Sequence, residues 1–533
     1  MQETNLKLIK SIIEENKNTE YGKKYNFSKI KNIEDYKNYV PISNYEDYEL
    51  FVKRMSNGEA NILTVYPIIA HLMTSGSEKA IRKLIPFSRK AAENMGQKAF
   101  LLRDKILNKY KKENKKEYIL FIGKMDIDLN KELPKEMILS EMLYYFSYKN
   151  KIIDLQNFYG GPDLLFDIGS EDFLYEKIWI SILKEDILDI ESIYMFSILQ
   201  FFIEFEKSYK DIISDIKKRE INPDKKLSEK SKNYLLNLPI SYERLEYVEK
   251  ECEKGFEGIA LRLWKNIKLI TGITSKTFIY ENKLLERYTK GISIDSFLFA
   301  LSESFIGFPK EINSYSYAID PTFSFYEFIP YNEDYYESNN NPEKTLLINE
   351  VEKDKLYELI ITNLSGLYRY RTYDVIKIIE KNENELLFEF ILRENLLLNI
   401  KQEKTTIKDI LNVMVKMENI VPDILGFCIG ATTVNQIATY FLFLFLDGKK
   451  ELKLNIDELE KKFDIFLSES NCLYKKYRHF NYIGQPKIFI KHQEQFNKLK
   501  ENLHYIKSHN KPKFIIPEPL LIDILKNEGY ISC

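Results

Sequence analysis

The fold prediction starts from the stretch Gly366-Leu367-Tyr368-Arg369-Tyr370-Arg371-Thr372-Tyr373-Asp374. Residues 356–361 before it and 375–379 after it are apolar and rich in β-forming side chains, which predicts two strands. Arginines, tyrosines and a carboxylate are therefore expected on a turn between two largely buried strands. Polar side chains held by rigid strands suit a ligand with hydroxyls, phosphates and a flat ring, whereas a solvated hairpin is the alternative.

The composition excludes several classes of protein. The chain has 533 residues, and its Lys+Arg 78 and Asp+Glu 80 give a net charge of -2, which leaves no excess of cations for nucleic acid. The four cysteines are scattered, so a disulfide framework or a cysteine zinc site is not expected. The apolar runs are shorter than the roughly 20 residues of a membrane-spanning helix, and the N-terminus lacks a signal pattern. We expect a monomeric cytoplasmic protein without membrane or nucleic-acid partners.

A second motif follows an apolar strand at residues 65–73. The strand ends in Thr74-Ser75-Gly76-Ser77, and Lys83 comes a few residues later. Backbone N–H groups and hydroxyls in such a loop can bind phosphate oxygens, and the lysine adds positive charge. A plain turn is the alternative, because clusters of Ser, Thr and Gly are common in turns.

The remaining pattern predicts further elements. Residues 6–13 have helical spacing, and residues 190–205 are apolar on most sides, which predicts a buried helix. Residues 323–330 predict an aromatic strand. A short charged link at 401–406 separates this part from a C-terminal part of alternating strands and helices, with a hairpin expected at Asp447-Gly448. We place the domain boundary there, with domains at 1–400 and 401–533.

Taken in order, these motifs resemble a known family. The phosphate loop with Lys83 is similar to that of the adenylate-forming enzymes, and Phe299-Ala300-Leu301-Ser302-Glu303 resembles their aromatic-x-x-Ser/Thr-Glu motif. The segment 326–330 and the stretch 366–374 resemble one branch in particular, the auxin-responsive family of acyl acid amido synthetases. The similarity extends from about residue 19 to about residue 511.

The resemblance implies a fold and a reaction. The fold is α/β: a large N-terminal adenylate-forming domain with β-sheets flanked by helices binds ATP and the acyl acid, and a small mobile α+β C-terminal domain closes over it. In the reaction, the carboxylate of a small acid attacks the α-phosphate of Mg·ATP, pyrophosphate leaves, and the acyl-adenylate then reacts with an amine. The amine is expected to be an amino acid, and AMP leaves as the amide forms.

The resemblance also implies roles for individual residues. The catalytic residues would be Ser302, which donates to the α-phosphate, and Lys511 of the mobile domain, which is a guess because the motif around it lacks a residue. Glu303 would bind Mg²⁺, a cation that prefers oxygen ligands. A carboxylate at the start of a helix is the alternative for Glu303. The nucleotide would contact Thr74, Ser75, Gly76, Ser77, Lys83, Phe299, Ser302, Glu303, Tyr326, Asp374 (ribose) and Arg393.

Four positions depart from the family pattern. Glu78 stands where the family has Ser or Thr, and Ala80 and Tyr373 replace glycines, while Leu301 replaces a small or hydroxyl residue. A tyrosine at a position of positive φ costs roughly 1–2 kcal/mol. Two alternatives therefore stay open: acyl transfer to coenzyme A or a protein thiol, and a degenerate protein that binds nucleotide or acid without turnover. The sequence does not identify the acid or the amine.

Overall fold

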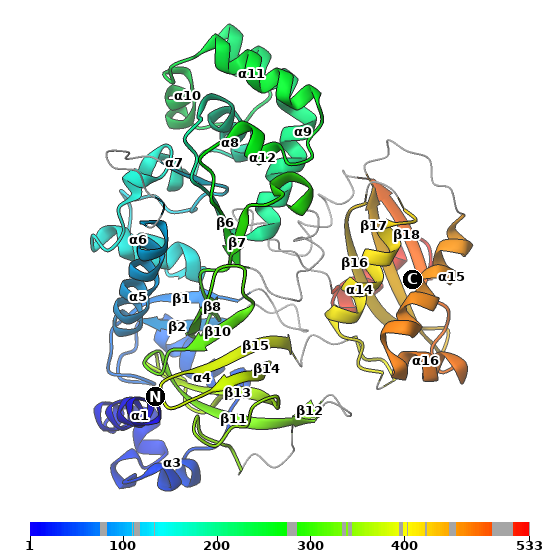
Figure 1. The fold of residues 1–533 in the computed structure, drawn as a ribbon. Helices are drawn as coiled ribbons and strands as arrows, with labels where there is room; N and C mark the ends of the chain where they lie inside the picture. The colour runs from blue at the N-terminus through cyan, green and yellow to red at the C-terminus, as the bar shows by residue number, and fades with distance from the viewer. Residues whose placement is uncertain are drawn as a thin grey trace.

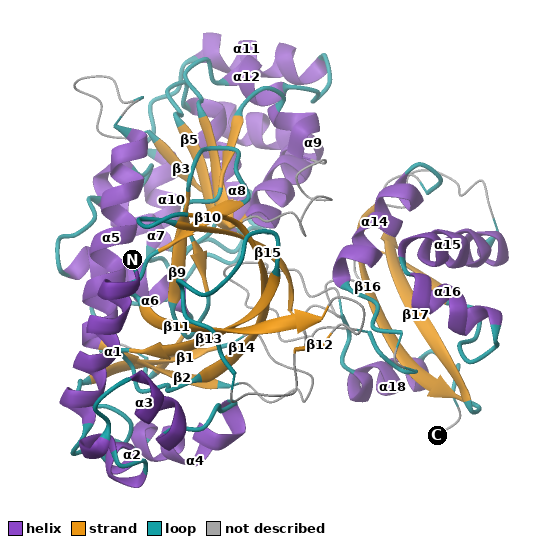
Figure 2. Cartoon of the chain, turned by 60° about the horizontal axis from the view of Figure 1, so that its bottom comes forward, coloured by secondary structure: helices purple, strands orange, loops and turns teal. Residues whose placement is uncertain are grey.

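The computed structural model describes residues 1–74, 83–108, 110, 118–132, 134–273, 285–332, 337–338, 344–393, 398–401, 403–421, 424–446, 455–492 and 515–531. The described chain forms a large N-terminal domain with three sheets and a C-terminal domain with one sheet, which lies to one side in Figure 1. Helices flank the sheets in both domains (Figure 2). The mixed α/β fold with two domains confirms the predicted fold class, whereas the boundary at residue 400 and the mobility of the small domain stay predictions.

A parallel sheet forms one end of the large domain, at the top of Figure 1. Its order is β3-β5-β6-β7, with strands Ile119–Phe121, Asp189–Tyr194, Leu269–Ile273 and Ser293–Asp295. The helices nearby are α7 (Gly161–Leu165), α8 (Phe173–Leu183), α9 (Met195–Lys218), α10 (Glu229–Leu236), α11 (Tyr242–Glu253) and α12 (Ile259–Leu263). The helix predicted over 190–205 is wrong in its first part, where strand β5 precedes helix α9. A parallel strand that is buried on both faces shows no alternation, so its pattern resembles that of a buried helix.

The other side of this sheet carries a buried polar cluster. Helices α5 (Arg89–Leu107) and α6 (Leu139–Lys149) supply Arg103 and Tyr144, and both side chains donate to the Glu191 carboxylate. The Thr271 hydroxyl donates to both carboxylate oxygens of Asp189, at 2.9 Å each. Burial, with Glu191 nearby, raises the pKa of Asp189 to about 8.

An antiparallel sheet forms the other end of the large domain, and it carries the motif stretch. Its order is β12-β11-β13-β14-β15-β10-β9-β8. The strands are β8 (Phe299–Ala300), β9 (Phe305–Pro309), β10 (Ser316–Ile319), β11 (Ser324–Asn332), β12 (Glu337–Ser338), β13 (Leu356–Asn363), β14 (Tyr370–Lys381) and β15 (Leu386–Arg393). The strands predicted at 323–330, 356–361 and 375–379 are confirmed as parts of β11, β13 and β14.

The N-terminal helices cover this sheet. They are α1 (Gln2–Asn16), α2 (Glu20–Lys24), the 3-10 helix η1 (Phe27–Lys29), α3 (Ile33–Tyr39) and α4 (Tyr45–Ser56). Asn5 of α1 is fully buried, and its amide donates to the carbonyl oxygens of Pro321 and Ser324. A third sheet of order β2-β1-β4 contains β1 (Ile68–Met73), β2 (Leu84–Ser88) and β4 (Glu136–Met137), so β1 leads into the predicted phosphate loop.

The C-terminal domain has a three-stranded sheet in the order β16-β17-β18, with strands Ile424–Val434, Ile437–Leu446 and Lys487–His492. Strand β17 alternates: its even-numbered residues 440, 442 and 444 pack with α14 (Ile407–Glu418), α15 (Ile456–Ser470) and α16 (Cys472–His479). Its odd-numbered residues 441, 443 and 445 pack with α18 (Glu518–Asn527). The hairpin expected at Asp447-Gly448 lies outside the described residues. The observed β16–β17 hairpin turns at Asn435 and Gln436, which both have positive φ, as a tight hairpin turn requires.

Candidate active site

A β-bulge in β14 presents the carboxylate of Asp374. Glu358 pairs with Val375, but Ile360 pairs with Arg371, so the residues between them on β14 outnumber those on β13. The Thr372 hydroxyl fills the gap, since it donates to the Leu359 carbonyl at 2.7 Å and accepts the Asp374 N–H at 3.1 Å. Tyr373 has a φ of 61° in this bulge. Tyr373, which replaces the family glycine, therefore has the left-handed backbone conformation that is costly for a residue other than glycine.

Asp374 forms a two-pronged ion pair with Arg393 on the neighbouring strand β15. The two carboxylate oxygens accept from Nε at 2.6 Å and from the terminal nitrogen at 2.8 Å. The side chain of Asp374 is 1% exposed, whereas that of Arg393 is 36% exposed. Burial alone would lower the pKa of Arg393, but the Asp374 carboxylate outweighs it and the pKa is raised. Each carboxylate oxygen has two acceptor positions, so Asp374 retains capacity for ligand hydroxyls.

Glu303 lies at the tip of a tight turn between β8 and β9. Leu301 and Ser304 exchange backbone hydrogen bonds across the turn, at 2.8 and 3.3 Å, and the Asn363 side chain donates to the Glu303 carbonyl at 2.7 Å. The alternative that placed Glu303 at a helix start is therefore wrong.

The electrostatics of Glu303 identify its neighbours. Its pKa is raised by burial and by Asp374, while Arg393 and Lys83 act to lower it. Burial also raises the pKa of Tyr370 on β14, with the Glu303 carboxylate as the next cause. We call Lys83, Glu303, Asp374 and Arg393 the charged cluster. Lys83, Glu303 and Asp374 come from three separate motifs, and Arg393 lies on the strand next to Asp374. Their joint role in binding a nucleotide stays a prediction.

Phe299 extends the site on the same sheet. Its partly exposed ring lies 5.4 Å from the rings of Tyr317 and Phe388 and 5.6 Å from that of Phe390. Phe388 and Phe390 belong to β15, the strand that ends at Arg393. Ser302 is partly exposed beside Glu303. A flat aromatic surface and a hydroxyl therefore accompany the charged cluster.

The phosphate loop is described only at its two ends. The Thr74 N–H donates to the Lys83 carbonyl at 3.1 Å, which closes the base of the loop. Ser75, Gly76, Ser77, Glu78 and Ala80 lie outside the described residues, and so does Lys511. The roles of these residues stay predictions.

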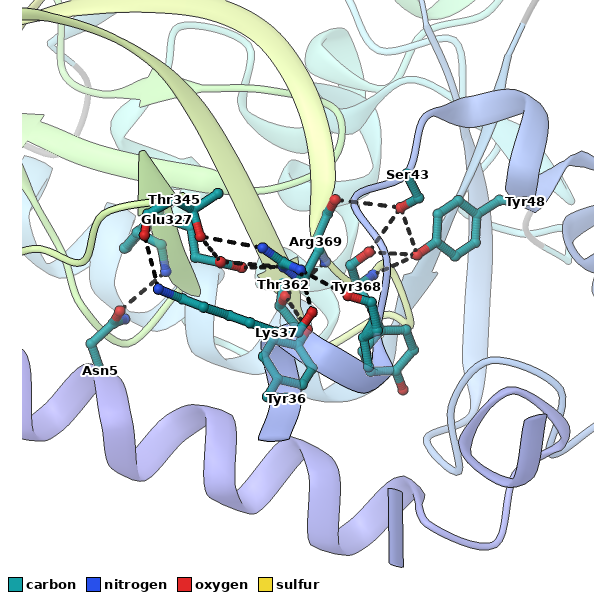
Figure 3. A network of polar contacts seen from close by, with 12 residues as sticks. Asn5, Tyr36, Lys37, Ser43, Tyr48, Glu327, Thr345, Thr362, Tyr368 and Arg369 are labelled. Atoms are coloured by element: carbon teal, nitrogen blue, oxygen red, sulfur yellow. Dashed lines mark hydrogen bonds and ion pairs between the residues drawn. The ribbon is translucent and has the colours of Figure 1, made fainter. Parts of the chain in front are cut away.

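The arginines of the motif stretch have partners within the protein, and Figure 3 shows those of Arg369. Arg369 is 2% exposed, donates to both carboxylate oxygens of Glu327, and also donates to the carbonyls of Lys37 and Val40 and to the Thr345 hydroxyl. Arg371 forms a two-pronged pair with Glu358, at 2.9 and 2.6 Å. Arg369 is therefore a structural residue that fastens the stretch before Asp374, whereas a ligand contact by the partly exposed Arg371 stays a prediction.

Two tyrosines of the motifs are core residues. Tyr368 is fully buried, donates to the Leu63 carbonyl at 2.6 Å and stacks on Tyr21. Tyr326 is also fully buried, and its hydroxyl lies 3.1 Å from the Asp320 carbonyl and 3.3 Å from that of Ile306. Tyr326 therefore packs in the core, and its contact with the nucleotide stays a prediction.

Sequence reasoning missed two residues that touch the site. Asn363 at the end of β13 holds the Glu303 turn, and Tyr45 at the start of α4 lies against Lys83. Asn363 could have been suspected, because a strand that ends in Asn just before a glycine turn often uses its side chain there. Tyr45 carried no such signal, since it is 38 positions before Lys83 and begins an ordinary amphipathic helix.

The described residues limit which metal sites the protein can form. The part of the chain that the structure describes has no group of three or more His, Cys, Asp or Glu side chains that could hold a metal by themselves. None of the described helices is long and apolar enough to span a membrane. A metal ion at Glu303 would therefore need oxygen ligands from elsewhere, as Mg²⁺ commonly takes from phosphates.

The chain is similar in sequence and in fold to several known proteins. The chain is 28% identical to the indole-3-acetic acid-amido synthetase GH3.4 of Arabidopsis thaliana, over 76% of this chain and 69% of that protein. It is 25% identical to the jasmonoyl–L-amino acid synthetase GH3.5 of Oryza sativa subsp. japonica, over 75% and 72% of the two chains. The structure of the GH3.15 acyl acid amido synthetase superposes with a TM-score of 0.81 at 21% identity, covering 98% of this chain and 93% of that one.

A more distant likeness agrees on the fold. A 2-hydroxyisobutyryl-CoA ligase in its postadenylation state superposes with a TM-score of 0.53 at 8% identity, over 99% of this chain and 91% of that one. The GH3 family central domain matches residues 317–393, which contain Asp374 and Arg393. Since the GH3 family N-terminal domain matches residues 1–294, more than half of the 533 residues, the chain belongs to the GH3 family, the auxin-responsive promoter family.

Proposed function

We propose that this protein is an ATP-dependent acyl acid amido synthetase, a ligase that adenylates a small carboxylic acid and transfers the acyl group to an amine. The observation that carries the proposal is the charged cluster, in which Arg393 pairs with Asp374 and the charges of Lys83, Arg393 and Asp374 act on Glu303, with the Phe299 ring on the same sheet. Family membership supplies the reaction class, because the relatives named above are synthetases that join acids to amino acids.

The donor set fits ATP with Mg²⁺. Asp374 has spare acceptor positions for the ribose hydroxyls, and Phe299 offers a face for the adenine. Lys83 and Arg393 would bind phosphate oxygens together with Thr74, Ser75, Gly76 and Ser77. Glu303 is a partly exposed carboxylate beside these cations, which suits a metal that takes one or two carboxylates and completes its shell with phosphate and water. When bound there, Mg²⁺ would neutralise negative charge on the phosphate oxygens.

The proposed chemistry has two steps. An oxygen of the acid's carboxylate forms a bond to the α-phosphorus while the bond to pyrophosphate breaks, and Ser302, Lys83 and Arg393 would stabilise the charge on the phosphate oxygens. The nitrogen of the amine then bonds to the acyl carbon of the adenylate, AMP leaves with the bonding electrons, and the nitrogen loses a proton. An amino acid is the proposed amine. Lys511 as a catalytic residue of the first step, the monomeric state and the cytoplasmic location stay predictions from the sequence.

ATP–pyrophosphate exchange, screened over a panel of carboxylic acids, tests the first step. We expect acid-dependent exchange with at least one acid in the wild type, and its loss in Asp374→Ala. Mass spectrometry of products with amino acids, coenzyme A or neither then identifies the acceptor. A thioester in place of an amide would refute the amide proposal, and the absence of exchange with every acid would leave the non-catalytic binding protein as the better explanation.

Glu78 is the decisive position for the non-catalytic alternative. A carboxylate 4 Å from a phosphate at an effective dielectric near 20 is worth about 4 kcal/mol of repulsion before screening. We expect the Glu78 side chain to face solvent, because the remaining motif residues occur in order along the chain. Glu78→Ser should therefore leave exchange unchanged. A wild type without exchange whose ATP binding is restored by Glu78→Ser would overturn the enzyme proposal.

A further inference from the structure

The start of helix α4 is fastened to the strand that carries Asp374. Ser43 donates its N–H to the Arg369 carbonyl at 3.0 Å and accepts the Arg371 N–H at 2.8 Å, so it pairs like a short extra strand beside Tyr370. Asn44 then begins α4 with a capping box, in which the Asp47 carboxylate accepts the Asn44 N–H at 2.9 Å. The backbone of the next residue, Tyr45, is therefore fixed relative to the active-site sheet.

The Tyr45 side chain reaches from this fixed point to the end of the phosphate loop. Its hydroxyl accepts the Leu84 N–H at 3.0 Å, and the Lys83 ammonium lies 5.2 Å from the centre of its ring. Tyr45 is 8% exposed as a whole residue. Tyr45 thus contacts two successive residues: its hydroxyl accepts the backbone N–H of Leu84, and its ring lies against the ammonium group of Lys83. Because cations are attracted to the face of an aromatic ring, these contacts favour one direction for a flexible lysine.

We propose that Tyr45 is a positioning residue for Lys83, which it holds toward the Glu303 side of the site to meet phosphate oxygens. The inference rests on the proposed function for the identity of the ligand. The positive charge of Lys83 is also among those that act to lower the pKa of Glu303. Without the ring and the hydroxyl, the Lys83 side chain would have to become ordered each time a nucleotide binds, and the Leu84 N–H would lose its acceptor on the segment that pairs with β14.

A double-mutant cycle on ATP affinity tests whether Tyr45 acts through Lys83. Calorimetry would give the Kd for ATP of the wild type, Tyr45→Leu, Lys83→Met and the double variant. We expect Tyr45→Leu to raise the Kd about three- to tenfold, the size of a cation–π contact, and less than about twofold in the Lys83→Met background. An equal loss in both backgrounds would overturn the positioning role, because the tyrosine would then act independently of the lysine.

Hydrogen exchange in the nucleotide-free protein gives a readout that needs no ligand. Tyr45→Phe keeps the ring but removes the acceptor of the Leu84 N–H, so exchange at that amide should accelerate at least about tenfold. Tyr36→Phe is the matched control: its buried hydroxyl pairs with Thr362 at 2.7 Å, and its loss should leave Leu84 unchanged. Unchanged exchange at Leu84 in Tyr45→Phe would overturn the positioning role even with normal ATP binding, whereas a wild type that does not bind ATP would overturn the proposed function.

Discussion

Removing the guanidinium of Arg369 should destabilise the large domain without a direct effect on ligand contacts. The side chains of Arg369 and Glu327 are 3% and 1% exposed, and the arginine also satisfies two carbonyl oxygens and the Thr345 hydroxyl. Arg369→Met would leave the Glu327 carboxylate buried with Thr345 as a remaining partner. Breaking a buried ion pair from one side costs about 3–5 kcal/mol. For a cooperative unit of about 400 residues, with an unfolding entropy near 2.1 cal/mol/K per residue, this lowers Tm by about 4–6 °C.

Differential scanning calorimetry measures this change, with Arg54→Met as the comparison. Arg54 and its partner Glu20 are 40% and 44% exposed, so the loss of this arginine should lower Tm less than that of Arg369. The double variant Glu327→Leu/Arg369→Met should recover part of the lost Tm, because no uncompensated charge remains buried. An Arg369→Met protein with an unchanged Tm but a much weaker affinity for ATP would refute this reasoning, and it would restore Arg369 as a ligand-binding arginine.

Three further predictions concern single residues. Glu303→Gln should raise the Mg²⁺ concentration needed for half-maximal exchange while changing Mg²⁺-free nucleotide binding less, and an unchanged Mg²⁺ dependence would contradict the metal role. Tyr373→Gly should be more stable than Tyr373→Ala by about 1–2 kcal/mol in thermal unfolding, because both lose the stack on Arg371 but only glycine relieves the strain at a φ of 61°. The pKa of Asp189 is raised to about 8 in the folded protein, whereas aspartates of the unfolded chain titrate near 3.9. The folded state therefore binds this proton more tightly. As the pH rises toward about 8, the contribution of Asp189 to the free energy of unfolding falls by up to about 1.4 kcal/mol per pH unit. Asp189→Asn should therefore lose less Tm than the wild type between pH 6 and pH 8, and parallel pH profiles would refute the raised pKa.

The sequence predicted the strands on both sides of the motif stretch and the first helix because their patterns are local. Residues 6–13 show helical spacing and lie in α1. The failure at residues 190–205 has a physical cause, since a parallel strand buried on both faces shows no alternation that distinguishes it from a helix. The turn at Asn435 and Gln436 was overlooked because it contains no glycine.

The sequence named candidate site residues, but it did not give all of their partners. Glu303 and Asp374 were named from motifs, and the structure pairs Asp374 with Arg393 and places both among the charges that act on Glu303. The roles of the motif arginines could not be derived from spacing, because the partners of Arg369 include Lys37 and Val40, more than 300 positions away. An arginine that binds a ligand and one that fastens a strand look alike in a sequence, and only the partners distinguish them.

The contact between Arg369 and α3 also sets the order in which the chain can fold. The Lys37 carbonyl and the arginine that donates to it are 332 positions apart, and Asn5 and Ser43 likewise bind residues more than 300 positions away. At a synthesis rate of about 5–20 residues per second, the N-terminal helices wait on the order of tens of seconds on the ribosome for the strands that cover them. During that time their apolar faces are exposed, so chaperone capture and aggregation of nascent chains should concentrate in the first sixty or so residues.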